Sequence, residues 1–177
     1  GAVGFDIHCG VRVLALEATI DDIPNIKKLG GRMAGRIPAG ASGKGGLDID
    51  MPQIRALTEG GAQAAVEMGI GFDEDLSSLE SNGLLEVEDA TLSSRALERG
   101  LRALGTLGSG NHFLELQSVE KLVDEETAKH WGLYEGQLLA MIHSGSRGLG
   151  HQVCSEHSRK LEQKYKRTAN GWYAEEY

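Results

Sequence analysis

The chain has 177 residues, of which 40% are hydrophobic and 25% are charged, as is usual for one soluble globular domain. Its formal net charge of -8 excludes a general polyanion-binding surface, so a nucleic-acid partner would have to be met by a few placed arginines. The two cysteines, Cys9 and Cys154, are too few for a disulfide scaffold, and no apolar run approaches the roughly 18 residues of a membrane span. These features predict a cytoplasmic protein with no membrane partner.

Glycine is the unusual component. The 25 glycines are about twice the usual share of roughly 7%, and they cluster at 30–46, 100–110 and 145–150. This clustering indicates shaped loops and not a low-complexity linker. Because the chain starts without an initiator methionine and stops directly after a helical pattern, residues 1–177 are expected to be a single partial domain of a longer protein.

The first half of the chain predicts a strand and two helices. Residues 11–18 alternate apolar and polar side chains as a half-buried strand does. A helix is expected to start at Asp21–Asp22 and to weaken at Gly30–Gly31, followed by a glycine-rich loop over 34–48. Pro52 suits the first turn of a helix that reaches Met68, and an acidic connection follows.

The second half predicts strands and helices in alternation. We expect a helix over 93–104, a strand over 112–119, a short helix over 125–131 and a buried strand over 137–142. A last amphipathic helix is indicated by the helical spacing of Val153, His157, Leu161 and Tyr165. The interspersed elements predict an α+β fold, with a mixed sheet and flanking helices.

Two glycine-rich stretches carry histidines beside apolar runs: Leu104–Glu115 (LGTLGSGNHFLE) and His143–His151 (HSGSRGLGH). Neither is a common nucleotide or hydrolase motif. The run from Gly40 to Gly45 lacks the spacing and the hydroxyl of a phosphate-binding Walker loop. The run from Gly108 misses the last glycine of the dinucleotide fingerprint, and the serines after His143 do not form a nucleophile elbow.

Asp6, Cys9, His112 and His143 form a candidate metal site. They offer a carboxylate, a thiolate and two imidazoles, a set of mixed hardness that could hold one divalent ion or two ions that share a ligand. Ligand softness favours zinc, with manganese second. Each of the four taken alone is more often structural, as a turn cap or a buried cysteine or histidine. Their joint placement in glycine-rich loops favours the metal site.

Arginines near these loops predict an anion site. Arg147 lies among serines and glycines whose hydroxyls and amides could converge with its guanidinium on a phosphate. On the 93–104 helix, Arg99 or Arg102 could face the same pocket, whereas Arg95 fits a solvated face equally well. If the next strand starts near Asn111, then Asn111 and Glu115 point to one face and His112 to the other.

Four stretches together resemble the RtcB family, the tRNA-splicing ligases that join RNA ends. They are GAVGFDIHCGVR at the start of the chain, ERG at 98–100, LGTLGSGNHFLE and MIHSGSRGLGHQV. The similarity spans nearly the whole chain and includes IPAG at 37–40 and DLSSLESNG at 75–83. It implies that the chain is a partial domain of the RtcB-type ligase fold.

The resemblance also implies a reaction and a set of roles. The family uses GTP and manganese to join an RNA 2′,3′-cyclic phosphate or 3′-phosphate to a 5′-hydroxyl, through a histidine-bound GMP and an RNA end activated as 3′-pp-G. By resemblance Cys9 bridges two manganese ions, Asp6 and His112 bind one of them, and His143 binds the other, which replaces the zinc expectation. Nucleotide contacts are implied for Asn111, His112, Phe113, Leu114 and Glu115, and phosphate or RNA contacts for Arg99 and Arg147.

The sequence departs from the family pattern in three respects. His8 stands where a smaller residue is expected and is not taken as a ligand, and Ala103 stands where glutamine is expected. The guanylated histidine of the family belongs to a segment downstream, since His151 and His157 lack its context. We therefore expect the chain alone to be inactive.

Two alternative functions stay open at this stage. One is a metal-dependent phosphoesterase with the same metal site, and the other is a non-catalytic metal- or RNA-binding domain. The sequence leaves open whether tRNA halves or broken RNA are joined, and whether an activating protein partner is needed.

Overall fold

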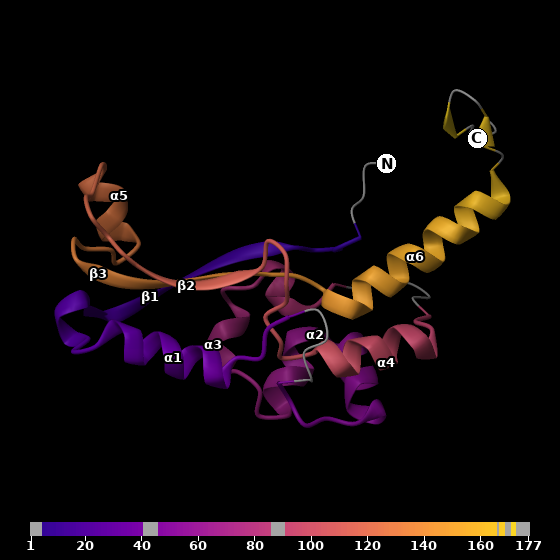
Figure 1. Cartoon of the computed structure of the whole chain (residues 1–177), viewed down its shortest axis with the longest axis horizontal. Coiled ribbons are helices and arrows are strands. Elements are labelled where there is room, and N and C mark those ends of the chain that lie inside the picture. The colour runs from indigo at the N-terminus through magenta and orange to yellow at the C-terminus, as the bar shows by residue number, and fades with distance from the viewer. Residues whose placement is uncertain (1–4, 41–45, 86–90, 166, 169–170, 173–177) are drawn as a thin grey trace.

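A three-stranded antiparallel sheet with helices around it forms the scaffold of the chain (Figure 1). The computed structural model describes residues 5–40, 46–85, 91–165, 167–168 and 171–172. Strand β3 (Gln137–Ser144) lies in the centre, between β1 (Gly10–Thr19) and β2 (Phe113–Ser118). The predicted α+β class with flanking helices is confirmed. The sheet is not mixed as predicted, because both of its pairings are antiparallel.

The first helical segment differs from its prediction. A short 3-10 helix, η1 (Ile20–Asp22), comes first, and α1 (Ile26–Arg36) begins only after Pro24. Asn25 caps α1, because its side-chain oxygen accepts a hydrogen bond from the Lys28 amide at 2.9 Å. The expected start at Asp21–Asp22 is therefore wrong, and the helix continues through Gly30–Gly31. Two helical glycines cost only about 1 kcal/mol each relative to alanine, and the loop expected from residue 34 begins only after Arg36.

Helix α2 (Met51–Glu67) confirms the helix that was predicted to start near Pro52. Asp50 and Gln53 form a reciprocal capping box with two bonds of 2.9 Å. Inside the helix, Gly61 has φ 59° and ψ -146°, a conformation that kinks the axis. The expected acidic connection contains two short turns, α3 (Asp73–Leu76) and η2 (Glu80–Gly83).

Helices α4 (Ser94–Ala103) and α6 (Arg147–Lys164) pack against each other beside the sheet. Leu97 of α4 is 1% exposed. Ile54 of α2 packs close to Gly100, which also belongs to α4. The remaining buried apolar residues of the described chain are Ala64, Ala96, Ala128 and Leu138.

The stretch His143–His151, expected as a loop, is divided between β3 and α6. His143 and Ser144 end the strand, and Arg147 begins the helix. The stripe expected on this helix is not its buried side, because Leu161 is 55% exposed whereas Gly150 and Gln152 are buried. Figure 1 shows the reason: the C-terminal half of α6 extends past α4, so its four-residue spacing does not meet a neighbouring helix within the described residues.

The remaining predictions for the second half are confirmed. Helix α5 (Glu125–His130) is capped by Asp124 and follows β2 and precedes β3 in the sequence. Two short strands, β4 (Arg167–Thr168) and β5 (Gly171–Trp172), pair near the end of the chain and were not predicted. In the described part of the chain, none of the helices combines the length and the apolar character needed to cross a membrane.

The kink at Gly61 gives a stability prediction. Gly61→Ala should lower the free energy of unfolding by about 1–3 kcal/mol, because a Cβ at this positive φ would collide with the Gly83 carbonyl. Gly30→Ala is the control, since a Cβ there meets nothing within 4 Å and should leave stability equal or higher. Urea unfolding of both variants checks this, and equal midpoints for both would contradict it.

Candidate metal cluster

The sheet register brings the four predicted metal residues together. Val11 of β1 and Phe113 of β2 both lie opposite His143 of β3. Each edge strand therefore starts beside the end of the central strand. The residue just before the start of each edge strand lies next to His143. Cys9 precedes β1 and His112 precedes β2, so both side chains meet His143 although more than a hundred residues separate Cys9 from either histidine.

Thiol and imidazole atoms of this cluster are close enough to share an ion. Cys9 Sγ lies 3.0 Å from His143 Nε2 and 3.5 Å from His112 Nε2. One ligand atom from each of the three residues lies within 4.8 Å of the others. Ligands of one ion, bound at about 2.0–2.3 Å, stand at such separations. Asp6 adds a carboxylate, whose Oδ2 lies 2.6 Å from His112 Nε2. We define these four residues as the metal cluster.

The side chain of His112 is almost completely enclosed. Its side chain is 4% exposed, and its Nδ1 is buried without a hydrogen-bond partner in the described chain. Gly108 allows this placement, because a Cβ there would overlap His112 Nδ1. Gly145 does the same for Asp6, since a Cβ would lie 2.5 Å from Asp6 Oδ1. The glycines of both loop motifs therefore act by making room for the candidate ligands.

Interactions within the cluster lower the pKa of Asp6 and raise the pKa of Cys9. Partial burial is the largest single influence on Asp6 and raises its pKa, but hydrogen bonds with Cys9 and His112 and the charges of His112 and Arg147 together lower that pKa below its ordinary value. The hydrogen bond to Asp6, helped by desolvation, raises the pKa of the Cys9 thiol. Without a cation, the cluster favours a carboxylate beside a neutral thiol.

His8 lies outside the group of potential ligands found among the described residues. It is exposed and has φ 61°, a left-handed conformation in which asparagine, aspartate and histidine are enriched among the residues other than glycine.

The two predicted phosphate-binding arginines occupy different environments. Arg147 starts α6 with φ 51° and donates to the Gly40 carbonyl at 3.1 Å and to Thr106 at 3.4 Å. Its charge reaches Asp6. Arg99 lies on α4, where it donates to Gln152 at 2.9 Å and lies 3.3 Å from His151 Nδ1. Gly40, Thr106 and Gln152 were not predicted, because nothing local in the sequence identifies a partner so distant.

The predicted nucleotide stretch does not divide between two faces as expected. Strand β2 begins at Phe113, so His112 lies in the preceding turn, where alternation does not apply. The rings of His112 and Phe113 lie 5.4 and 5.6 Å from the His143 ring. His112 is therefore on the same side of the sheet as His143 and its register partner Phe113. The expected opposite faces do not occur, because the strand does not start near Asn111.

The other members of this stretch are spread around β2. Asn111 and Glu115 are exposed, and Glu115 accepts a hydrogen bond of 2.6 Å from Gln117. Leu114 lines a groove on the other side of the sheet, together with Leu116 and Met33 of α1. Only the backbone of Leu114 could reach a ligand that contacts Glu115.

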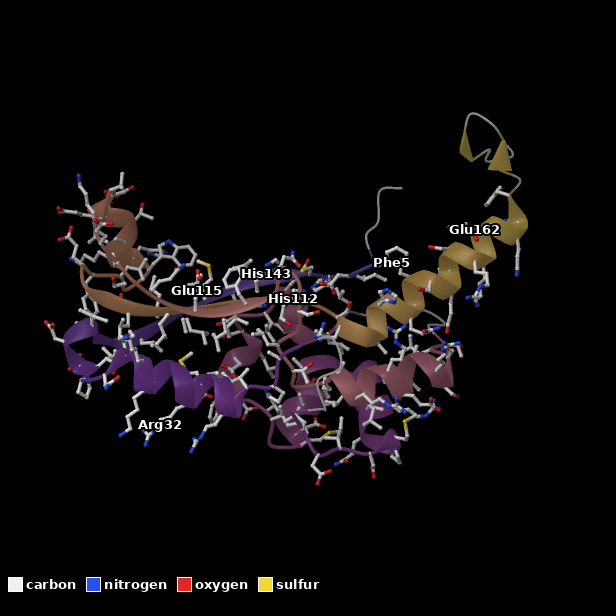
Figure 2. All side chains as sticks on the ribbon, viewed as in Figure 1. Phe5, Arg32, His112, Glu115, His143 and Glu162 are labelled. Atoms are coloured by element: carbon white, nitrogen blue, oxygen red, sulfur yellow. The ribbon has the colours of Figure 1, made fainter. Side chains whose placement is uncertain are left out.

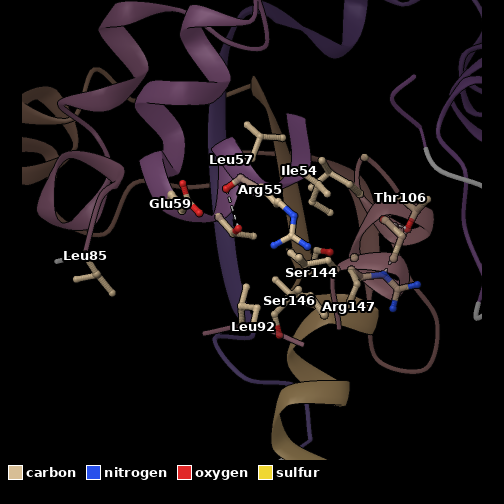
Figure 3. Close-up of a pocket in the computed structure, with 18 of the residues that line it drawn as sticks. Ile54, Arg55, Leu57, Glu59, Leu85, Leu92, Thr106, Ser144, Ser146 and Arg147 are labelled. Carbon is tan, nitrogen blue, oxygen red and sulfur yellow. Dashed lines mark hydrogen bonds between the residues drawn. The ribbon is translucent and has the colours of Figure 1, made fainter. Parts of the chain in front are cut away.

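A cavity of about 1080 Å³ lies beside the metal cluster (Figure 3). Apolar residues of α2 and α4 line it, together with Thr106 and the segment 144–147. None of the four cluster residues lines it, although Arg147 does. The Ser146 hydroxyl is buried without a partner in the described chain, and the Arg55 side chain extends toward Ser144. Neither Arg55 nor this cavity was predicted, because α2 carries no motif that marks it.

Comparison with known proteins gives one consistent result. A family model described as tRNA-splicing ligase RtcB matches residues 1–176. The tRNA-splicing ligase RtcB of Thermococcus kodakarensis is 43% identical over 174 residues, which cover 97% of this chain and 36% of that protein. The one of Nanoarchaeum equitans is 44% identical over 169 residues, covering 94% and 35%. The chain thus spans about a third of the length of these curated relatives.

The lowered pKa of Asp6 predicts a pH-dependent contribution to stability. In metal-free buffer, Asp6→Asn should lower the free energy of unfolding by about 1 kcal/mol near pH 6. This contribution is fully present above the unfolded pKa, near 3.8, and is lost as the pH falls through the lower native pKa. Urea unfolding between pH 6 and pH 2.5 measures it, with the exposed Asp21→Asn as the control. A difference that grows toward low pH would contradict the assignment.

Proposed function

Because the family model covers residues 1–176, the chain belongs to the RtcB family of tRNA-splicing ligases, and we propose that it supplies the metal-binding part of an RNA ligase. The observation that carries this proposal is the convergence of Asp6, Cys9, His112 and His143. These residues come from three separate motifs of the sequence. The ligand atoms of Cys9, His112 and His143 lie within 4.8 Å of one another, and Asp6 Oδ2 lies 2.6 Å from His112 Nε2.

The proposed metal content is two manganese ions. Cys9 would bridge them, Asp6 and His112 would hold one, and His143 would hold the other. In support, Cys9 Sγ is close to both histidine Nε2 atoms, as a bridging thiolate has to be. The exposed Cys9 and the buried His112 leave one side of the cluster accessible and the other enclosed. Bound cations would polarise phosphoryl oxygens and stabilise the charge that develops during phosphoryl transfer.

The proposed reaction joins an RNA 2′,3′-cyclic phosphate or 3′-phosphate to a 5′-hydroxyl with GTP as the cofactor. Residues 111–115 would contact the guanine nucleotide, because Phe113 and Glu115 lie on the same side of the sheet as His143. Arg147 uses two of its donor groups on protein oxygens, and a guanidinium has five N–H donors. The remaining donors of Arg147, and Arg99 on α4, would hold phosphate oxygens.

The substrate would be tRNA halves or broken RNA in the cytoplasm. The histidine that carries GMP is proposed to lie outside residues 1–177, so the chain alone would bind metal without forming the adduct.

Removal of the thiol tests the metal assignment. Cys9→Ala should lower Mn²⁺ affinity at least about 100-fold, because the bridging ligand of both ions is lost. Isothermal titration calorimetry of the chain with MnCl₂ at pH 7.5 measures this affinity. Two control variants should bind Mn²⁺ as the parent does. Cys154→Ala removes the other free cysteine, and His8→Asn removes an imidazole while keeping a residue that tolerates positive φ. Unchanged Mn²⁺ binding by Cys9→Ala would refute the assignment.

A nucleotide-labelling experiment tests the reaction class. A full-length protein that contains this chain should form an acid-labile, hydroxylamine-resistant label when it is incubated with α-labelled GTP and Mn²⁺. The 177-residue chain should form none. If the full-length protein takes up no label from GTP but releases phosphate from RNA 3′-phosphate ends, it is a metal-dependent phosphoesterase and not a ligase.

A further inference from the structure

Helix α1 carries four cations that the metal cluster does not use. We define Lys27, Lys28, Arg32 and Arg36 as the α1 basic face. All four side chains are exposed, and α1 contains no acidic residue. Within the described residues, none of the four side chains forms a hydrogen bond or an ion pair, and the only ion pair there joins His112 and Asp6. By contrast, Arg99 and Arg147 donate to internal acceptors.

The cations form a row that points away from the sheet. Lys28, Arg32 and Arg36 follow one another at four-residue intervals, which places them about 6 Å apart along the helix axis. The apolar side of α1, with Met33 and Ile37, shares a groove with β2. Figure 2 shows Arg32 on the side of α1 remote from the sheet, whereas His112 and His143 lie on the opposite side of the sheet.

Two glycines leave the helix backbone bare beside this row. Gly31 and Gly35 are one helical turn apart, and on a helix of 3.6 residues per turn they fall between Lys27 and Lys28. An added Cβ at either position would meet nothing within 4 Å. Glycine weakens a helix, and packing within the described chain gives no reason for glycine at either position. A partner backbone could approach the helix closely along this bare strip.

The partner that fits is a chain of regularly spaced anions. Basic helices that bind lipid surfaces insert their apolar side, and the apolar side of α1 faces the sheet instead. A nucleic-acid strand needs only the cations and the bare backbone, because its phosphates repeat along one line. We propose that the α1 basic face binds the phosphate backbone of RNA, at a part of the strand remote from the ends that would meet the metal cluster. This inference rests on the proposed function for the identity of the polyanion.

Neutralisation of the α1 basic face tests the proposal. Fluorescence anisotropy would measure binding of a 20-nucleotide single-stranded RNA with hydroxyl groups at both ends, in EDTA, between 50 and 250 mM KCl. Replacing the four cations by glutamine should weaken binding and reduce the slope of log affinity against log salt by up to about 3, at about 0.7 per phosphate contact. A matched control neutralises four exposed cations on other elements: Lys121, Lys129, Arg159 and Lys164.

The control variant has the same net charge and should keep the slope of the parent. Equal slopes for both quadruple variants, or an absence of RNA binding by the parent chain, would overturn the proposal. Circular dichroism melting shows whether the variants fold alike.

Gly31→Ala with Gly35→Ala tests the bare strip without any change of charge. The thermal midpoint should stay equal or rise, since alanine favours helix, while RNA affinity should fall. Unchanged affinity would overturn the close approach.

Measuring the binding of the same variants to vesicles of phosphatidylcholine and phosphatidylserine distinguishes RNA from an anionic lipid surface as the partner. Binding to vesicles that depends on the α1 basic face, without such binding to RNA, would overturn the proposal in favour of lipid. Because this assay contains neither GTP nor metal, its outcome is independent of the labelling experiment. If a full-length protein forms no GMP label but its RNA binding shows the salt slope that depends on the α1 basic face, the ligase proposal is refuted and the RNA-binding proposal is supported.

Discussion

The pairing of β3 with both of its neighbours is the constraint on which the metal cluster depends. His143 faces Val11 on one side and Phe113 on the other, so one position of the central strand fixes the entry points of two loops. A slip of one residue in either pairing would turn His143 to the other side relative to that edge strand. The cluster is therefore set by backbone hydrogen bonds, and the glycines beside it only make room for the side chains.

Without a metal ion, the cluster holds a carboxylate beside a neutral thiol and a buried imidazole nitrogen that lacks a hydrogen-bond partner in the described chain. Asp6 is held as a carboxylate with a lowered pKa, and its hydrogen bond raises the pKa of the Cys9 thiol. His112 Nδ1 has no partner in the described chain. A cation would favour the thiolate and so reverse the effect of Asp6 on Cys9. Metal binding would thus release a proton, and affinity would increase with pH.

Local patterns in the sequence predicted the elements whose ends carry their own signals. Pro52 in the first turn marks α2, and the apolar run that begins at Gln137 marks β3. Predictions failed where distant contacts decide. Leu161 of the expected apolar stripe is 55% exposed, because the C-terminal half of α6 extends past α4. The members of the cluster could be named from ligand chemistry, but the side on which His112 lies could not, because it depends on where β2 begins.

The sheet separates two kinds of cation chemistry. On one side, the metal cluster gathers an acidic and a soft side chain with two imidazoles, a set whose chemistry suits a metal ion better than a polyanion. On the other, the α1 basic face offers four charges without internal partners. In a chain of net charge -8, long-range attraction of RNA to the whole surface is weak, so a local row of cations has the larger effect on where a strand lies. If RNA binds this row as proposed, the body of the strand lies on the opposite side of the sheet from the cluster, so only an end of the strand would have to reach the cluster residues.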